Sequence, residues 1–318
     1  MLVKKLTLSL LFVLFFSFLL PQKSFSQCFQ IESILVDACS SNDEEGFNEM
    51  VRFKVGSSAI NTSNLSVSWP SNDWEGLLKN ATTASKTTTL NNDIIEAGGC
   101  GKLIEPTSGV LPANATVILV TSYNLETSSN SFGALMEDIY IIYQNHNTYP
   151  NVGHFGNYNA ASGIRTLQIN FGSCKDVVSY DRTKLTDPSG VNMAADGAIV
   201  EFTAAGQASY LNNGCSAPVK PFTVDAGVSE IEACPGETIN LNGTAQGQSS
   251  VKWSANSGVF SNATSLSTSY TVSLTAIGII PLTLTITNSC GKEISDIINV
   301  KVKSGLVPTF NEVSPICS

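Results

Sequence analysis

Short runs of alternating apolar and polar residues, separated by Asn, Gly and Ser, constrain this chain more than any other feature. Such runs have the two-residue period of β-strands. A helical period is almost absent, and the segment Phe132–Met136 is the one short helix candidate. Because the connections are rich in the residues that turns require, eight or more short strands predict an all-β fold built of β-sandwiches.

The predicted strands fall into two differently patterned regions. In the first region they cover residues 31–36, 50–55, 65–69, 116–121, 139–143, 166–171, 177–180 and 198–202. In the second, smaller region they cover residues 237–242, 251–254, 269–274, 281–287 and 294–302. Trp253 stands where an immunoglobulin-like sandwich places its core tryptophan, early in the strand after the first hairpin. We therefore expect one sandwich in each region.

Proline-containing joints set the predicted boundaries. The stretch Cys215–Pro221 holds two prolines between the regions, and a second joint follows Lys303. The resulting organisation is a signal peptide at 1–26, a first β-sandwich at 27–217, a second β-sandwich at 218–303, and the start of a further, truncated repeat at 304–318.

The N-terminus has the three parts of a secretory signal peptide. Lys4 and Lys5 precede the apolar run Leu6–Leu20, and Ser24 and Ser26 stand where a signal peptidase reads small residues. We expect cleavage before Gln27 and no transmembrane segment in the mature chain, because the run is short for a bilayer span. The prediction is a secreted or cell-surface protein.

Composition agrees with export and excludes one class of partner. Charged residues make up 14% of the chain, and the net charge is −9. Binding to nucleic acid needs clustered Lys and Arg, and no basic stripe is present, so a nucleic-acid partner is not expected.

Eight cysteines are scattered along the chain without a Cys-x-x-Cys pair, and the only histidines are His146 and His154. A zinc site therefore lacks its usual ligand spacing. In an oxidising compartment scattered cysteines indicate disulfides, and five cysteines precede Pro218, so at least one of them must be free or pair elsewhere. The disulfide candidates are Cys28, Cys39, Cys100, Cys174, Cys215, Cys234 and Cys290.

Two pairings are open for Cys290. One partner is Cys234, because Cys234 and Cys290 are the only cysteines inside the second region. In an immunoglobulin-like sandwich, however, the two would lie at opposite ends of the domain, whereas a disulfide needs α-carbons within roughly 7 Å. The alternative is a bridge between neighbouring domains, for example Cys215 with Cys290.

Several segments of the first region carry a family resemblance. Residues 31–39 (IESILVDAC), 46–53 (GFNEMVRF) and 111–122 (LPANATVILVTS), with late strands at 165–172 and 175–181, resemble the lamin-tail type of immunoglobulin-like domain. More closely, they are similar to the version found at the N-terminus of large surface proteins of Bacteroidetes. The resemblance covers roughly Cys28 to Cys215.

The second region resembles a repeat of the same proteins. Residues 234–243 (CPGETINLNG) and 288–291 (NSCG) are similar to PKD-like or immunoglobulin-like repeats. The resemblance implies a long surface protein with many repeats and a sorting domain of the secretion system associated with gliding motility. Residues 307–318 look like the opening of another repeat, in which Cys317 would match Cys234, so we expect the chain to be a fragment or a frame that ends early.

One loop, at residues 140–158 and called the His154 loop below, gathers the candidate ligand-binding residues. Aromatic faces beside Asn and Gln side chains can stack on a sugar and hydrogen-bond to it, but a packed loop that covers a sheet edge is the favoured interpretation. His154 is also the best available general base, but no nucleophile motif accompanies it, so no catalytic residue is assigned. The candidates are Tyr143, Tyr149, His154, Phe155 and Tyr158.

Carboxylates near the start of the first region are a weaker candidate for calcium. Asp43, Glu44 and Glu45, with Asp37 and Glu49 nearby, could supply oxygen ligands, but the spacing of a calcium-binding loop is absent. A solvated turn is the favoured interpretation, and no cofactor is expected.

The sequence thus predicts a non-catalytic exported protein of the cell surface or the extracellular space. Adhesion or scaffolding as part of a larger surface protein is the leading function, and its partner would be a glycan or another surface protein. The alternative is a carbohydrate-binding accessory module of a secreted hydrolase. Both rest on analogy, because folds of this kind host many roles.

Overall fold

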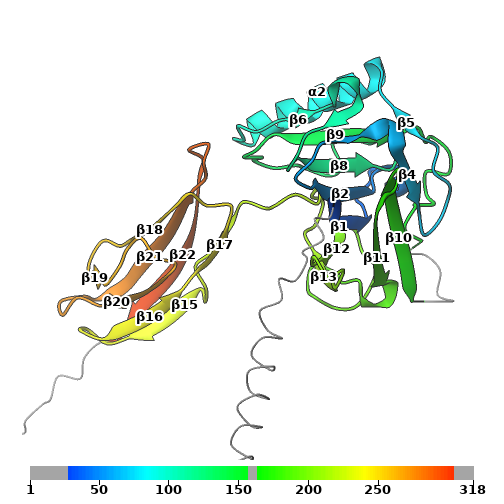
Figure 1. Ribbon diagram of the computed structural model, residues 1–318. Helices are drawn as coiled ribbons and strands as arrows, with labels where there is room; N and C mark the ends of the chain where they lie inside the picture. Colours follow the sequence, from blue (N-terminus) through cyan, green and yellow to red (C-terminus); the bar gives the residue numbers. More distant parts are fainter. Residues whose placement is uncertain (1–27, 157–162, 304–318) are drawn as a thin grey trace, which may run out of the picture.

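The computed structural model describes residues 28–156 and 163–303, so the predicted signal peptide and the truncated repeat lie outside the described residues. Two bodies of β-structure are joined by one crossing segment near residue 220 (Figure 1). The all-β fold class with two sandwich domains is confirmed, although the first domain also carries a helix.

The large sheet of the first domain has the strand order β13-β12-β1-β2-β8-β9-β5, with β6 pairing alongside β9. Most neighbours are antiparallel, but β9 runs parallel to both β8 and β6. Its strands are β1 (Phe29–Asp37), β2 (Met50–Val55), β5 (Leu77–Leu78), β6 (Leu103–Ile104), β8 (Thr116–Val120), β9 (Ile139–Gln144), β12 (Ala198–Phe202) and β13 (Ala208–Asn212).

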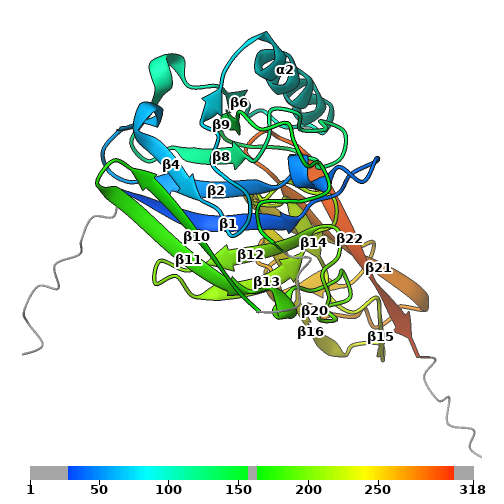
Figure 2. The same cartoon turned by 90° about the vertical axis from the view of Figure 1, so that its right-hand side faces the viewer.

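A smaller sheet of order β11-β10-β4 packs on one face of the large sheet, and Figure 2 shows β10 and β11 in front of it. Its strands are β4 (Leu65–Ser68), β10 (Ile164–Phe171) and β11 (Cys174–Asp181). The short pair β3 (Ile60–Asn61) and β7 (Val110–Leu111) and the 3₁₀ turns η1 (Glu45–Phe47), η2 (Thr62–Asn64), η3 (Thr107–Gly109) and η4 (Arg182–Lys184) complete the domain.

Both faces of the large sheet are buried. Alternate residues of a strand point to opposite faces, so Val51, Phe53 and Val117 join the core between the two sheets, while Met50 and Ile118 join a second core on the other face. This explains why the central strands contain long apolar runs in addition to simple alternation.

The second face is covered in part by a helix that the sequence pattern did not predict, α2 (Ala81–Glu96). Its buried stripe consists of Thr83, Thr87, Leu90 and Ile94. Threonine therefore occupies two of the four buried positions at which an amphipathic helix usually has apolar residues, and threonine is a poor helix former. The sequence does contain an N-cap residue for this helix, Asn80, whose side chain accepts hydrogen bonds from the backbone N–H groups of residues 82 and 83.

The predicted helix at Phe132–Met136 is wrong. The segment is an irregular loop whose Phe132 and Leu135 side chains are buried in the core beneath α2. Ser131 at its start bridges to Ser216, so the loop is held by the chain that leaves the first domain. Phe132 and Leu135, although three residues apart, are therefore two buried anchors of a loop and not one face of a helix.

The second domain is an immunoglobulin-like sandwich of two facing sheets, of order β15-β22-β21-β18 and β16-β20-β19, with a short pair β14-β17. The parallel pairing of β15 with β22 is the one exception to its antiparallel arrangement among the described strands. The strands are β14 (Thr223–Asp225), β15 (Glu230–Ala233), β16 (Thr238–Asn242), β17 (Thr244–Gln246), β18 (Ser250–Ser254), β19 (Val259–Phe260), β20 (Ser267–Thr271), β21 (Gly278–Thr287) and β22 (Glu293–Val302).

The core of the second domain follows the predicted alternation. Leu282, Leu284 and Ile286 on β21 are fully buried, and the threonines between them are not. Trp253 on β18 is buried as predicted, and its indole N–H donates to the backbone oxygen of Ser265 at 3.0 Å.

The segment between the domains is pinned to the first domain over its first half. The backbone of Ser131 exchanges hydrogen bonds with Cys215 and Ala217 at 3.0 and 2.9 Å. Ala217 and Val219 are buried in the core beneath α2. The boundary after Ala217 stays a prediction, but packing places Val219, two residues beyond it, with the first domain.

Candidate functional site

The predicted aromatic binding loop is largely buried. Tyr143, His154 and Phe155 have at most 1% of their surface exposed, and Tyr158 lies outside the described residues. Of the described candidates, Tyr149 alone is exposed, at 67%, at the tip of the loop. The prediction that these rings form a stacking surface is therefore wrong for three of them, because packing against the sheet removes their faces from solvent.

A buried hydrogen-bond network holds this loop on the large sheet. The Gln144 side-chain nitrogen lies 2.8 Å from Nε2 of His154 and also donates to the backbone oxygen of Thr121 at 3.1 Å. Trp69 donates its indole N–H to the Gln144 side-chain oxygen at 2.7 Å. Since Gln144 donates to Nε2, the proton of neutral His154 belongs on Nδ1, which lies 3.8 Å from a carboxylate oxygen of Glu49.

Glu49 anchors the same loop through its backbone. One carboxylate oxygen accepts the N–H of His154 at 2.5 Å, and the N–H of Phe155 also bonds to the carboxyl group. Burial raises the pKa of Glu49 well above its usual value, against these two backbone bonds. Burial, together with the neighbouring His146, lowers the pKa of His154 to about 3.

This arrangement fits a packed structural loop. A general base must reach its substrate within hydrogen-bond distance, and the His154 ring has no exposed surface. A Cβ at Gly153 would lie 1.9 Å from the Glu49 carboxylate, so only glycine allows the loop to close over that group. The favoured interpretation, a packed loop that covers a sheet edge, therefore describes this segment better than a binding surface does.

The acidic run does not form a compact set of metal ligands. Asp43 and Glu44 are exposed, whereas Glu49 is turned into the protein to hold the His154 loop. Among the described residues, no group of three or more His, Cys, Asp or Glu side chains is placed to hold a metal ion.

Three disulfides connect six of the seven candidate cysteines. They join Cys28 with Cys174, Cys39 with Cys215, and Cys100 with Cys290. Cys234 is exposed and has no disulfide partner among the described residues, so its prediction as a bonded cysteine is not met there. The predicted pairing of Cys234 with Cys290 is wrong, and so is the pairing of Cys215 with Cys290. The alternative of a disulfide between the two domains is confirmed, because Cys290 bonds to Cys100 of the first domain.

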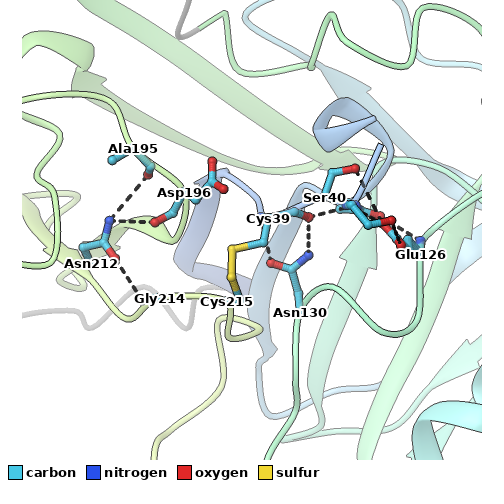
Figure 3. Close-up of a disulfide and its surroundings, with 11 residues drawn as sticks. Cys39, Ser40, Glu126, Asn130, Ala195, Asp196, Asn212, Gly214 and Cys215 are labelled. Atoms are coloured by element: carbon cyan, nitrogen blue, oxygen red, sulfur yellow. Dashed lines mark hydrogen bonds between the residues drawn. A yellow bond between two sulfur atoms is a disulfide. The ribbon is translucent and has the colours of Figure 1, made fainter. Parts of the chain in front are cut away.

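The Cys39–Cys215 bridge fixes the point at which the chain leaves the first domain. Buried Asn130 accepts the N–H of Cys39 at 3.1 Å and donates to its backbone oxygen at 2.9 Å, as Figure 3 shows. On the other side of the bridge, Asn212 donates to the backbone oxygens of Ala195 and Asp196 and accepts the N–H of Gly214 (Figure 3). It also donates to the backbone oxygen of Thr186. The start of the connecting segment is thus held by a covalent bond and by two asparagine side chains.

The Cys100–Cys290 bridge joins the two domains over a sequence separation of 190 residues. Cys100 lies in the turn after α2, and its N–H donates to the backbone oxygen of Leu135 at 3.0 Å. Cys290 lies in the tight turn between β21 and β22, where the buried side chain of Asn288 accepts the N–H groups of Cys290 and Lys292 at 2.9 Å each. Both cysteines are therefore presented by ordered turns.

Side-chain packing accompanies this bridge. The Lys292 stem lies against Gly98, where an added Cβ would meet its Cδ at 2.8 Å, and Gly98 has a φ of +85°. A residue with a side chain at position 98 would thus be strained and would also push Lys292 away. The two domains therefore also touch next to the covalent bond.

A groove of about 480 Å³ opens at this joint. It is lined by Ala97 and residues 131–134 of the first domain, by the connecting segment, and by Gln246, Lys292 and Ile294 of the second domain. Pockets in proteins occur preferentially at such domain interfaces, and this one is the candidate functional site.

Disulfides of this number are typical of proteins that fold in an oxidising, extracellular compartment. Within residues 28–156 and 163–303, no helix is long and apolar enough to span a membrane.

No family model and no curated protein matches the sequence. Among solved structures, the chain is similar to the PKD domain of the KIAA 1837 protein, at 23% identity over 30% of this chain and 100% of that one, with a TM-score of 0.24. It is also similar to domains 4 and 5 of the S-layer protein SbsC, at 9% identity over 76% and 98% of the two chains, with a TM-score of 0.21.

A third similar structure is SGBP-B of the Bacteroides ovatus mixed-linkage glucan utilisation locus, in complex with a mixed-linkage heptasaccharide. Its identity is 11% over 77% of this chain and 62% of that one, with a TM-score of 0.17. The fold class rests on the strands of this chain themselves. None of the three concerns a lamin-tail domain or gliding motility.

Sequence reasoning missed Cys100 as the partner of Cys290 and missed the groove residues altogether. The number of cysteines before Pro218 did indicate that one of them is free or pairs elsewhere, and Cys100 is that residue. The groove left no sequence signal, because its walls come from segments far apart in the chain.

Proposed function

We propose that this chain is a non-catalytic adhesion or scaffold segment of an exported surface protein, in which the two domains act as one stiff unit. The observation that supports this function is the Cys100–Cys290 bridge, since it closes the joint at a second point besides the connecting segment. A single linker would allow rotation between the domains, whereas two connections oppose it.

The proposal includes the finer predictions from the sequence. The chain would be exported by a cleaved signal peptide, its first domain would be lamin-tail-like and its second PKD-like, and the protein would belong to the surface or gliding-associated proteins of Bacteroidetes. The alternative of a carbohydrate-binding accessory module loses support at the His154 loop, where three of the predicted contact residues are buried.

Force spectroscopy tests this function. With handles before Cys28 and after Lys303, the oxidised chain can lengthen only through residues 28–100 and 290–303, which is about 300 Å at ~3.5 Å per residue. After reduction the whole segment can lengthen, to about 950 Å. An oxidised extension of about 350 Å, which is the length of residues 28–39 and 215–303 that Cys39–Cys215 alone would allow, would show that Cys100–Cys290 does not carry load, and the function proposed here would be abandoned.

A further inference from the structure

We propose that the groove between the two domains binds an acidic sugar, through the carboxylate of a uronic-acid unit in an oligosaccharide. This inference deepens the proposed function and rests on it, because both walls keep their places only while the domains are held together. The groove has the charge, the polar groups and the size for such a ligand.

The charge of the groove is opposite to that of the whole protein. The chain carries 26 acidic and 17 basic residues, yet the groove is lined by Lys220 and Lys292 and by no Asp or Glu. Within the described part of the chain, neither ammonium group forms an ion pair or donates a hydrogen bond to a protein atom. Two unpaired positive charges in one concave site favour an anionic ligand.

The kind of cation indicates the kind of anion. Lysine is a compact point charge, whereas arginine offers a planar fork that matches phosphate and carboxylate in two bonds at once. No arginine lines the groove. Two lysines without arginine suit single anionic groups that are spaced along a larger ligand, and an oligosaccharide of uronic-acid units has one such group per ring.

The rest of the lining suits the body of a sugar. Half-buried Phe222 and Pro221 offer an apolar surface, and exposed Asn213 and Gln246 offer amide donors and acceptors. A sugar ring has an apolar face of C–H groups and a rim of hydroxyls, so it can use both kinds of contact.

The size of the groove separates a small ligand from a protein partner. Its volume of about 480 Å³ lies inside the range of roughly 300–1,000 Å³ of small-molecule sites. A stable protein partner would instead cover about 800 Å² of surface on each side. A short stretch of an acidic polysaccharide therefore fits the groove better than a folded protein does.

The groove depends on the bridge between the domains. Lys292 follows Cys290 by two residues in the same turn, and its stem rests on Gly98, two residues before Cys100. Reduction would therefore release the wall that carries one of the two lysines while Lys220 stays with the connecting segment.

Calorimetry with a tetragalacturonate and a neutral tetrasaccharide tests the inference on the purified, oxidised chain. We expect saturable binding of the uronate that weakens with added salt, and no comparable binding of the neutral sugar. Lys220→Gln/Lys292→Gln is expected to weaken binding by about tenfold or more, because each removes a charged contact. Lys252→Gln/Lys301→Gln, the same charge change at two exposed strand positions, is expected to leave binding unchanged.

Three results would overturn the ligand assignment. They are no uronate binding by the oxidised chain, equal binding of the neutral sugar, and competition by an acidic peptide of the same charge as strongly as by the uronate. Cys100→Ser/Cys290→Ser separates this inference from the proposed function. Its oxidised chain is expected to lengthen through residues 28–39 and 215–303, to about 350 Å at ~3.5 Å per residue, against about 300 Å for the wild type. If the wild-type chain shows the shorter extension but binds no uronate, only the ligand is wrong, whereas a wild-type extension equal to that of the variant removes the basis of both.

Discussion

Replacing Trp253 with alanine is expected to destabilise the second domain by about 3–5 kcal/mol, the usual cost of emptying a buried tryptophan site. The indole is 2% exposed, stacks against Phe260 at a ring distance of 6.1 Å and donates to the Ser265 backbone. A domain of this size has a total stability of about 4–12 kcal/mol, so this single change removes a large part of it.

The tryptophan content of the chain allows each domain to be followed separately. Of the three tryptophans, Trp69 and Trp74 are in the first domain. In Trp253→Ala, tryptophan fluorescence therefore reports the first domain alone, whereas far-ultraviolet circular dichroism reports both. We expect denaturation followed by circular dichroism to begin early while the fluorescence midpoint stays in place, with Trp253→Phe as the milder control. Equal shifts of both signals would mean that the two cores unfold as one unit.

The second large effect is expected at Glu49. Glu49→Ala removes the acceptor of two buried backbone N–H groups, those of His154 and Phe155. An unsatisfied buried donor costs about 1–3 kcal/mol, so we expect a loss of about 3 kcal/mol or more in the first domain, measured by denaturation of the oxidised chain. Glu49→Gln keeps an oxygen acceptor and is the matched control. A loss from Glu49→Ala no larger than that from Glu49→Gln would contradict the anchoring role.

The same residue gives a pH dependence with a definite sign. The folded-state pKa of Glu49 is raised above its unfolded value, so folding takes up a proton between the two pKa values, and stability falls as pH rises through that window. Its contribution stops falling above the folded pKa. His154 acts in the opposite direction, because its folded pKa of about 3 lies below the unfolded value, and stability rises with pH between about 3 and 6.5.

The wild-type chain and Glu49→Gln both contain His154, so the difference between their free energies of unfolding removes the His154 contribution and leaves that of the Glu49 carboxyl group. The stability of the wild-type chain relative to Glu49→Gln is expected to fall as pH rises from about 4.5. A relative stability that stays flat or rises over this range would show that the Glu49 pKa is not raised.

Most strands could be predicted from the sequence because their apolar signal is strong. The strand at 50–55 agrees with β2 at both ends, and Trp253 and the alternating leucines of β21 are buried as expected. In these elements local pattern and tertiary environment agree, since the buried face is also the apolar face.

The failures share a physical cause, which is that the environment of a residue is set by distant segments. α2 is held by threonines that become buried only against β6 and β9, so its own apolar period is weak. The residues of the His154 loop could indicate either a packed loop or a binding surface, and contacts with Glu49 and Gln144 decide between them. The partner of Cys290 depends on where the turn after α2 lies in space, which no sequence spacing shows.

A tryptic peptide map of the purified chain, made without reduction, tests directly whether Cys100 and Cys290 are bonded to each other. Cys100 is the one cysteine in the tryptic fragment 87–102, and Cys290 is the one cysteine in the fragment 253–292. The structure predicts that these two fragments are recovered as one covalently linked species, which separates on reduction. Recovery of 253–292 linked to the fragment that carries Cys234, or with a free thiol, would contradict the bridge between the domains and the function that depends on it.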